Sequence, residues 1–401
     1  MNESPFSPVT MLSFRRCIST LCALLFGAGL CAAPVRPHIE TGEIAGARYA
    51  VAIPAKWNHT LLLVAHDYRP ESAPLQADLR LDDPVYGPLI QDGWMVASTS
   101  FRRNGIVVRD AIEDLDALRD VLIEAHGRPS QALLVGEGLG GTIVTIMAER
   151  LRERYTGALA LVPAFDMSEP NSMTGITHSP HIPLLLVATR TSYQPILQYT
   201  QRVPVALDDQ LVRPQIARVD RTGRTNINDA ERLVALRLLH AWMDQGREAY
   251  ASPENRQLAG YSTPWRAIEK SPDLDITCTP RPGPSTVVWA DDRRSFTARV
   301  LEVAPYSGHV TLDIRPEDFN QLGLGRKSYV EMRAGERTIR VAMGRDFDSV
   351  KRGEWVAFPD ANGTICLARH GGNAAVSASL RAGDLVTFRR YDPPPKPVLR
   401  P

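Results

Sequence analysis

The sequence predicts an α/β protein with a mostly parallel sheet and covering helices, followed by a small antiparallel β-barrel. Short runs rich in Val, Leu, Ile and Ala recur in the first part of the chain, and stretches with helical spacing separate them. After about residue 250 the chain becomes rich in proline and then alternates in hydrophobicity. With 46 Lys and Arg against 45 Asp and Glu in 401 residues, no nucleic-acid partner is expected.

The apolar runs of the first part are nearly continuous, which favours strands buried on both faces of a sheet. Alternation of such strands with helices predicts a mostly parallel sheet, which we expect to occupy residues from about 40 to 250. The expected strands are Tyr49 to Ile53, Thr60 to His66, Trp94 to Ser98, Ala132 to Gly136, Ala158 to Val162 and Pro183 to Thr189.

Three helices are expected among these strands. The first has apolar residues at helical spacing from Val108 to Leu122, the second follows Gly136, and the third runs from about Asp229 to Met243. The first and the third of these helices present apolar residues at helical spacing.

The rest of the chain divides into a proline-rich linker or crossing segment at 251–284, a β-barrel at 285–392 and a tail at 393–401. Alternating runs separated by glycine-containing turns predict the barrel. These runs are Thr286 to Trp289, Phe296 to Val303, His309 to Ile314, Ser328 to Met332, Arg337 to Val341, Trp355 to Phe358 and Leu385 to Arg389.

Residues 1–32 have the pattern of a signal peptide. Arg15 and Arg16 precede an uncharged run from Ile18 to Leu30, which is too short to span a bilayer as a helix. Cleavage after Ala32 would leave a chain without a transmembrane segment, and we expect it to be periplasmic or secreted. The true start, at Met1 or Met11, stays open.

Lipid attachment at Cys31 is the competing interpretation of this leader, although the bulky Leu30 before it disfavours a lipobox. Removal of the leader leaves two cysteines, Cys278 and Cys366, and their pairing stays open. Two cysteines form no thiolate metal cage, and the sequence predicts neither a metal site nor a cofactor.

The first part resembles the α/β-hydrolases of the exported esterase and peptidase-like kind. The resemblance rests on the order and spacing of three segments, which are Leu62 to Tyr68, Gly93 to Gly105, and Gly136 to Gly141. It implies that the last segment is a nucleophile elbow, G-x-S-x-G, in which a tight strand-to-helix turn exposes a serine.

The residues that the resemblance makes catalytic are substituted in this chain. Gly138 stands in place of the nucleophilic serine, Thr191 falls where the acid is expected, and Arg224 occupies the place of the histidine base. Asp67 follows His66 where the family commonly has glycine beside the oxyanion hole. Glycine has no side chain with which to attack a carbonyl.

The sequence therefore favours a pseudohydrolase that binds a small acyl or peptide ligand, or a protein partner, without catalysis. The alternative is an ester or peptide hydrolase in which an acid in the old cleft activates water directly, with Glu137, Asp67 or His66 as the candidate base. Whether the barrel covers the old active site stays open.

The last hundred residues resemble the C-terminal barrel of the S-adenosylmethionine hydroxide adenosyltransferases. The resemblance rests on Gly353 to Phe358, Asn362 to Ala368, Gly372 to Ala375, and Gly383 to Val386. It implies nucleoside contacts at His309, Asn373 and Ala374. Since the other domain of that family is missing here, we expect a reused scaffold rather than a cofactor site.

Overall fold

The computed structural model describes residues 36–391 except 168–174, 205–210, 224–225, 246–265, 268–272, 281–283 and 325–327. The expected signal peptide at 1–32, the tail at 393–401 and Arg224 lie outside these residues. Most of the expected linker at 251–284 also lies outside them.

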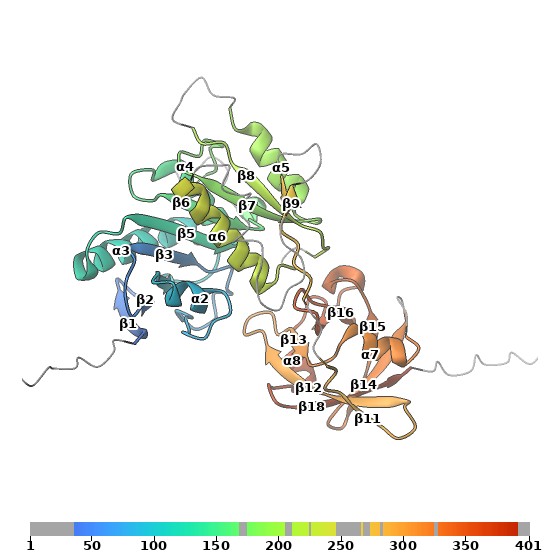
Figure 1. Ribbon diagram of the computed structural model, residues 1–401. Coiled ribbons are helices and arrows are strands. Elements are labelled where there is room, and N and C mark those ends of the chain that lie inside the picture. Colours follow the sequence, from blue (N-terminus) through green and yellow to red (C-terminus); the bar gives the residue numbers. More distant parts are fainter. Residues whose placement is uncertain are drawn as a thin grey trace, which may run out of the picture. The chain divides into compact units, whose positions relative to one another are not determined.

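The first sheet has ten strands among the described residues: β1 (His38–Ile44), β2 (Ala47–Ile53), β3 (Thr60–Ala65), β4 (Met95–Thr99), β5 (Gln131–Glu137), β6 (Gly157–Leu161), β7 (Leu184–Thr189), β8 (Gln215–Val219), β9 (Arg266–Ala267) and β10 (Leu274–Asp275). Their order is β1-β2-β4-β3-β5-β6-β7-β8-β10-β9 (Figure 1). In this spatial order, every pair of neighbouring strands from β4 through β3, β5, β6, β7 and β8 to β10 is parallel. The predicted mostly parallel sheet is confirmed.

Helices cover both faces of this sheet. The helices α3 (Val108–His126), α4 (Leu139–Arg150) and α5 (Tyr193–Arg202) pack with Leu61 and Leu63 of β3 in one core cluster. The helices α2 (Tyr86–Gln91) and α6 (Asp229–Gln245) pack with Leu62 in a second cluster on the opposite face. Alternate residues of the strand point to opposite faces. This burial on both sides explains why the strands have continuous apolar sequences.

The sheet extends further than the sequence predicts. Leu274 and Asp275 form β10 and pair in parallel with β8, although the expected sheet stops at about residue 250. Leu274 and Ile276 are buried in the second core cluster. A strand of two residues inside a proline-rich stretch has too little periodicity to be recognised from sequence.

The second sheet consists of β11 (Val288–Trp289), β12 (Ser295–Val303), β13 (Val310–Leu312), β14 (Tyr329–Ala334), β15 (Arg337–Met343), β16 (Trp355–Pro359), β17 (Ile365–Arg369) and β18 (Leu385–Arg390). Pairing of β12 with β18 closes seven of these strands into a barrel, with β11 outside the ring. Phe296, Phe319 and Phe388 pack ring to ring in its core. The predicted barrel is confirmed, but β15 and β16 pair in parallel.

Among the residues that the structure describes, two short α-helices accompany the barrel, α7 (Pro316–Gln321) and α8 (Ala374–Ala378). Around the first sheet, the three predicted helices correspond to α3, α4 and α6, whereas α2 and α5 were not predicted.

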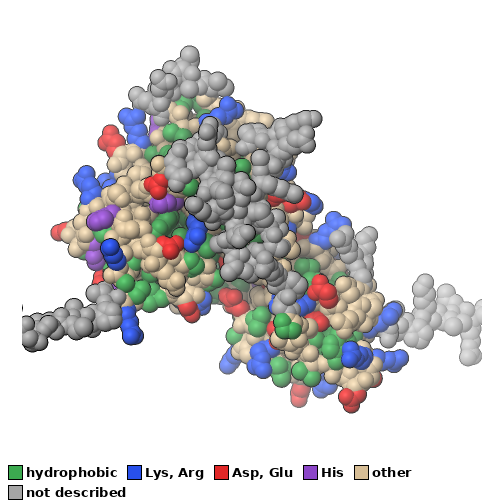
Figure 2. Space-filling view, viewed as in Figure 1, with side chains coloured by type: hydrophobic (Ala, Val, Ile, Leu, Met, Phe, Trp, Pro, Cys, Tyr) green, Lys and Arg blue, Asp and Glu red, His purple; other side chains and the backbone are tan. Residues whose placement is uncertain are grey.

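In the view of Figure 2, acidic and basic side chains are interspersed over the described surface, in keeping with a formal net charge of +1.

Candidate functional site

The strand-to-helix turn after β5 has the shape of a nucleophile elbow. Gly138 lies between β5 and α4 with φ 55° and ψ −114°. Its neighbours must also be small, because a Cβ at Gly136 would lie 2.3 Å from the carbonyl carbon of Gly140. A Cβ at Gly140 would lie 2.2 Å from the backbone oxygen of Ala65. These close approaches allow helix α4 to pack directly against strands β3 and β5.

The carboxylate of Asp67 fills the place of a side chain at position 138. An ideal Cβ built on Gly138 would lie 2.1 Å from Asp67 Oδ1 and 2.4 Å from its Cγ. Oδ1 accepts hydrogen bonds from the backbone N–H of Leu139, at 2.8 Å, and of Tyr68, at 2.7 Å. The N–H after the elbow position and an N–H from the loop after β3 are where a hydrolase of this fold places its oxyanion donors. Both donors are therefore engaged by one carboxylate oxygen of the chain itself.

His66 is held by backbone carbonyls rather than presented to a ligand. Its Nδ1 lies 2.6 Å from the oxygen of Asp67 and its Nε2 lies 3.1 Å from the oxygen of Ser100. Burial, with the charge of Arg69, lowers the pKa of His66 to about 4. The neutral ring has one N–H and can donate to one of these oxygens. With both nitrogens turned to the backbone, His66 has no lone pair aimed at the elbow.

Glu137, the last residue of β5, forms an ion pair with an arginine of helix α6. Its Oε2 lies 2.8 Å from Nη2 of Arg232, and its Oε1 accepts a hydrogen bond of 2.9 Å from the same nitrogen. Burial raises the pKa of Glu137, the guanidinium of Arg232 opposes this effect, and the charge of Asp67 adds to it. Arg232 was not among the expected site residues, although its place in the first turns of the predicted third helix was available as a signal.

The structure brings together the loops that carry the other two substituted positions. Thr191 is exposed just after β7, and its Oγ1 accepts a hydrogen bond of 3.0 Å from the N–H of Gly223. Arg224 follows Gly223 but lies outside the described residues. The expected acid position and the loop of the expected base position are thus adjacent.

The start of α6, close after that loop, is occupied by a buried polar network. Asn228 Oδ1 accepts from the N–H of Glu231 and Glu231 Oε2 accepts from the N–H of Asn228, each at 2.9 Å, which forms a reciprocal cap. Glu231, fully buried, also pairs with Arg221 and accepts a hydrogen bond of 2.8 Å from the N–H of Cys278. Burial raises the pKa of Glu231, which Arg221 opposes. This network fastens the segment around Cys278 to the helix.

The predicted nucleoside contacts of the barrel lie close together, but their polar groups serve the fold. Asn373 Oδ1 accepts a hydrogen bond of 2.8 Å from the N–H of Val376 and so caps α8. The side chain of Ala374 is buried in the barrel core. His309 is half-buried, loss of solvent lowers its pKa, and its ring lies 6.0 Å from that of Phe347. Nucleoside binding stays a prediction.

Within the described part of the chain, no group of three or more His, Cys, Asp or Glu side chains is arranged to hold a metal ion. None of the helices there is long and apolar enough to cross a membrane. Cys278 and Cys366 are both buried free thiols, so the pairing left open by the sequence is not formed.

Comparison with known proteins finds a family match for the barrel. Residues 308–387 match the family model of the SAM hydroxide adenosyltransferase C-terminal domain, which covers about a fifth of the chain. No curated protein matches the chain.

The similar solved structures include three with distant sequences. An uncharacterized conserved protein from Thermotoga maritima is 22% identical over 31% of this chain and 46% of its own, with a TM-score of 0.25. A putative dipeptidyl aminopeptidase IV from Bacteroides ovatus is 15% identical over 53% and 36%, with a TM-score of 0.41. An alpha-beta serine hydrolase homologue from Coxiella burnetii is 12% identical over 51% and 96%, with a TM-score of 0.37.

The chain spans less than half the length of the first two of these structures. Esterases also occur among the similar structures. The strand order and pairing themselves confirm a mostly parallel sheet with covering helices, followed by a barrel.

Proposed function

We propose that this protein is an exported, non-catalytic member of the α/β-hydrolase fold that binds a small acyl or peptide ligand or a protein partner. The observation that carries the proposal is the position of Asp67. Its carboxylate fills the space above Gly138 and accepts hydrogen bonds from the N–H groups of Tyr68 and Leu139. An acyl substrate finds neither a nucleophile nor free oxyanion donors at such an elbow.

The substitutions at the other two positions support the same conclusion. Thr191 has no carboxylate with which to orient a base, and Arg224 stays charged at any physiological pH and cannot accept a proton. The polar network of Asn228 and Glu231 supports a structural role for the segment that precedes α6. A chain with three substituted positions and an occupied oxyanion site lacks the groups that carry out the steps of acyl transfer.

The alternative is direct activation of water by an acid in the same cleft. The raised pKa of Glu137 favours it, because a buried carboxylate of raised pKa is a better base. The contacts of the candidates oppose it. Glu137 is paired with Arg232, Asp67 Oδ1 is engaged by two N–H groups, and His66 faces two carbonyls.

The proposed export rests on the leader pattern of residues 1–32 and places the protein in the periplasm or outside the cell. The N-terminus of the protein purified from its native compartment tests this proposal. We expect it to begin at Ala33, and a chain that begins at Met1 or Met11 would contradict export with cleavage.

Hydrolysis of a panel of short-chain and aryl esters and of peptide anilides by residues 33–401 tests the absence of catalysis. The matched control is the double variant Asp67→Ala, Glu137→Ala, which removes both candidate carboxylates. A second control, Asp67→Asn with Glu137→Gln, keeps their shape and removes their basicity. We expect all three proteins to give the same background rate. Turnover in the wild type that both double variants lose would establish the water-activating alternative.

A further inference from the structure

A cavity of about 470 Å³ opens at the carboxyl ends of β7 and β8. Asp220 and Arg221 line it from the sheet, and α7, the turn after β15 and the last residue of β16 line it from the barrel. Its volume is that of a small-molecule site, and ligands of open α/β sheets bind at the carboxyl ends of the strands. Neither Asp67 nor Gly138 lines the cavity, so it is separate from the elbow.

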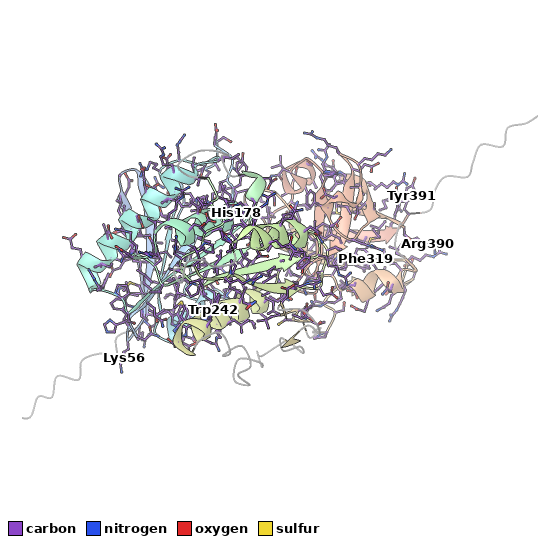
Figure 3. The ribbon with its side chains drawn as sticks, turned by 90° about the horizontal axis from the view of Figure 1, so that it is seen from above. Lys56, His178, Trp242, Phe319, Arg390 and Tyr391 are labelled. Carbon is purple, nitrogen blue, oxygen red and sulfur yellow. The ribbon has the colours of Figure 1, made fainter. Side chains whose placement is uncertain are left out.

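The barrel wall of the cavity is apolar. Leu324, Met343 and Pro359 line it, and the last two keep part of their surface exposed. Phe319 and Ile365 also line it but belong to the barrel core, with exposed fractions of 2% and 0%. Phe319, labelled in Figure 3, comes from α7 and packs edge to face with Phe388. Met343 adds a flexible thioether at the end of β15. A wall of this kind fits a flat apolar group.

The rim carries an excess of positive charge. Arg190 is neutralised by Asp220, with Nε 2.6 Å from Oδ1, and Arg221 is neutralised by Glu231. Arg345 is exposed and forms no ion pair with any residue that the structure describes. A guanidinium binds a carboxylate or another oxyanion through two parallel hydrogen bonds. One unneutralised cation therefore stands beside the apolar wall.

We propose that this cavity binds a small organic anion with a flat apolar body. The body lies against Leu324, Met343 and Pro359, and the anionic group pairs with Arg345. This proposal goes beyond the proposed function, because binding in the cavity does not depend on whether the elbow is catalytic.

A pair of probes that differ in charge tests the proposal. 1-Naphthoate and the neutral 1-naphthamide have the same aromatic body, and their dissociation constants with residues 33–401 are measured by calorimetry. We expect the wild type to bind naphthoate at least about tenfold more tightly than naphthamide, since one charge-assisted pair contributes over about 1.4 kcal/mol. Arg345→Gln should remove this preference. The control Arg294→Gln, an exposed turn residue that does not line the cavity, should keep it.

A second pair of variants tests the place of binding. Asn320→Trp puts a large side chain on the cavity lining, whereas Gln321→Trp changes the next residue of α7, which does not line it. We expect Asn320→Trp to weaken both probes at least about tenfold and Gln321→Trp to bind as the wild type. Wild type that binds neither probe, or Arg345→Gln and Asn320→Trp that bind like the wild type, would overturn the proposal. None of these outcomes depends on ester turnover.

Discussion

At the scale of single residues, Gly138 and Asp67 form a mutually dependent pair. Asp67 reaches the N–H of Leu139 because position 138 has no side chain, and a Cβ there would overlap its carboxylate. Gly138 also has a φ of +55°, which costs other residues about 1 to 2 kcal/mol. Restoring a serine at 138 therefore requires a change at 67 as well.

A double-mutant cycle measures this dependence. We expect Gly138→Ser to lower the free energy of unfolding by about 3 kcal/mol, the sum of backbone strain and overpacking against Asp67. In the Asp67→Gly background the same change should cost at least about 1 kcal/mol less, because the overlap is gone. Denaturant unfolding checks both values.

Gly127 provides the matched control for this cycle. It also has a positive φ, of 93°, but no atom lies within 4 Å of an added Cβ. Gly127→Ser should cost only the strain and should be insensitive to Asp67→Gly. Equal costs of Gly138→Ser with and without Asp67 would show that the two residues do not overlap in solution.

At the scale of elements, the start of α6 joins three segments of the chain. The carboxylate of Glu231 accepts hydrogen bonds from the N–H groups of Asn228 and Cys278 and forms an ion pair with Arg221, which follows β8. The helix start is therefore fixed by a buried carboxylate with several donors rather than by an apolar contact. Removal of such a partner leaves a buried charge uncompensated.

Glu231→Ala should consequently be among the most destabilising substitutions in α6. We expect a loss of about 3 to 5 kcal/mol, because Arg221 and the N–H of Cys278 lose their partner. Denaturant unfolding beside Asp244→Ala, an exposed residue near the other end of the helix, measures the difference. A loss below about 1 kcal/mol would contradict the structural role of this network.

The sequence predicted many of the elements but not all of them, and the ten-residue α5 and the seven-residue β1 are among those missed. Both α3 and α6 carry apolar residues at helical spacing over several turns, and β3 and β7 are continuous apolar runs. In contrast, β10 has two residues, too few to show a period. The parallel pairing of β15 with β16 depends on the path of the intervening chain, which hydrophobic pattern does not encode.

At the scale of the whole molecule, the sequence indicated what kind of site to expect but not which distant residues contact one another there. The family resemblance implied the positions Gly138, Thr191 and Arg224, but the approach of Asp67 to Leu139, 72 positions away, follows only from the packing of β3 beside β5. The same holds for the partner of Glu137. Arg232 lies 95 positions away and was missed.

The cysteines give a prediction for the folded chain as a whole. Cys278 and Cys366 are buried free thiols, and burial raises the pKa of each to about 12. Because the thiolate is the reactive form, we expect neither to react with Ellman's reagent in native residues 33–401 at pH 8, and both to react in guanidinium. A reductant should leave the melting temperature unchanged. Rapid native reaction, or a lower melting temperature after reduction, would contradict these buried, unpaired thiols.

Amide hydrogen exchange at Tyr68 and Leu139 tests most directly whether the carboxylate of Asp67 occupies the oxyanion donors of the elbow. The exchange rates of these two N–H groups are measured at one constant pH in residues 33–401 and in Asp67→Ala. We predict that both exchange slowly in the wild type and at least about tenfold faster in Asp67→Ala, because both donate to the same carboxylate oxygen. Exchange rates that Asp67→Ala leaves unchanged would contradict this occupation and return an open oxyanion site to the elbow.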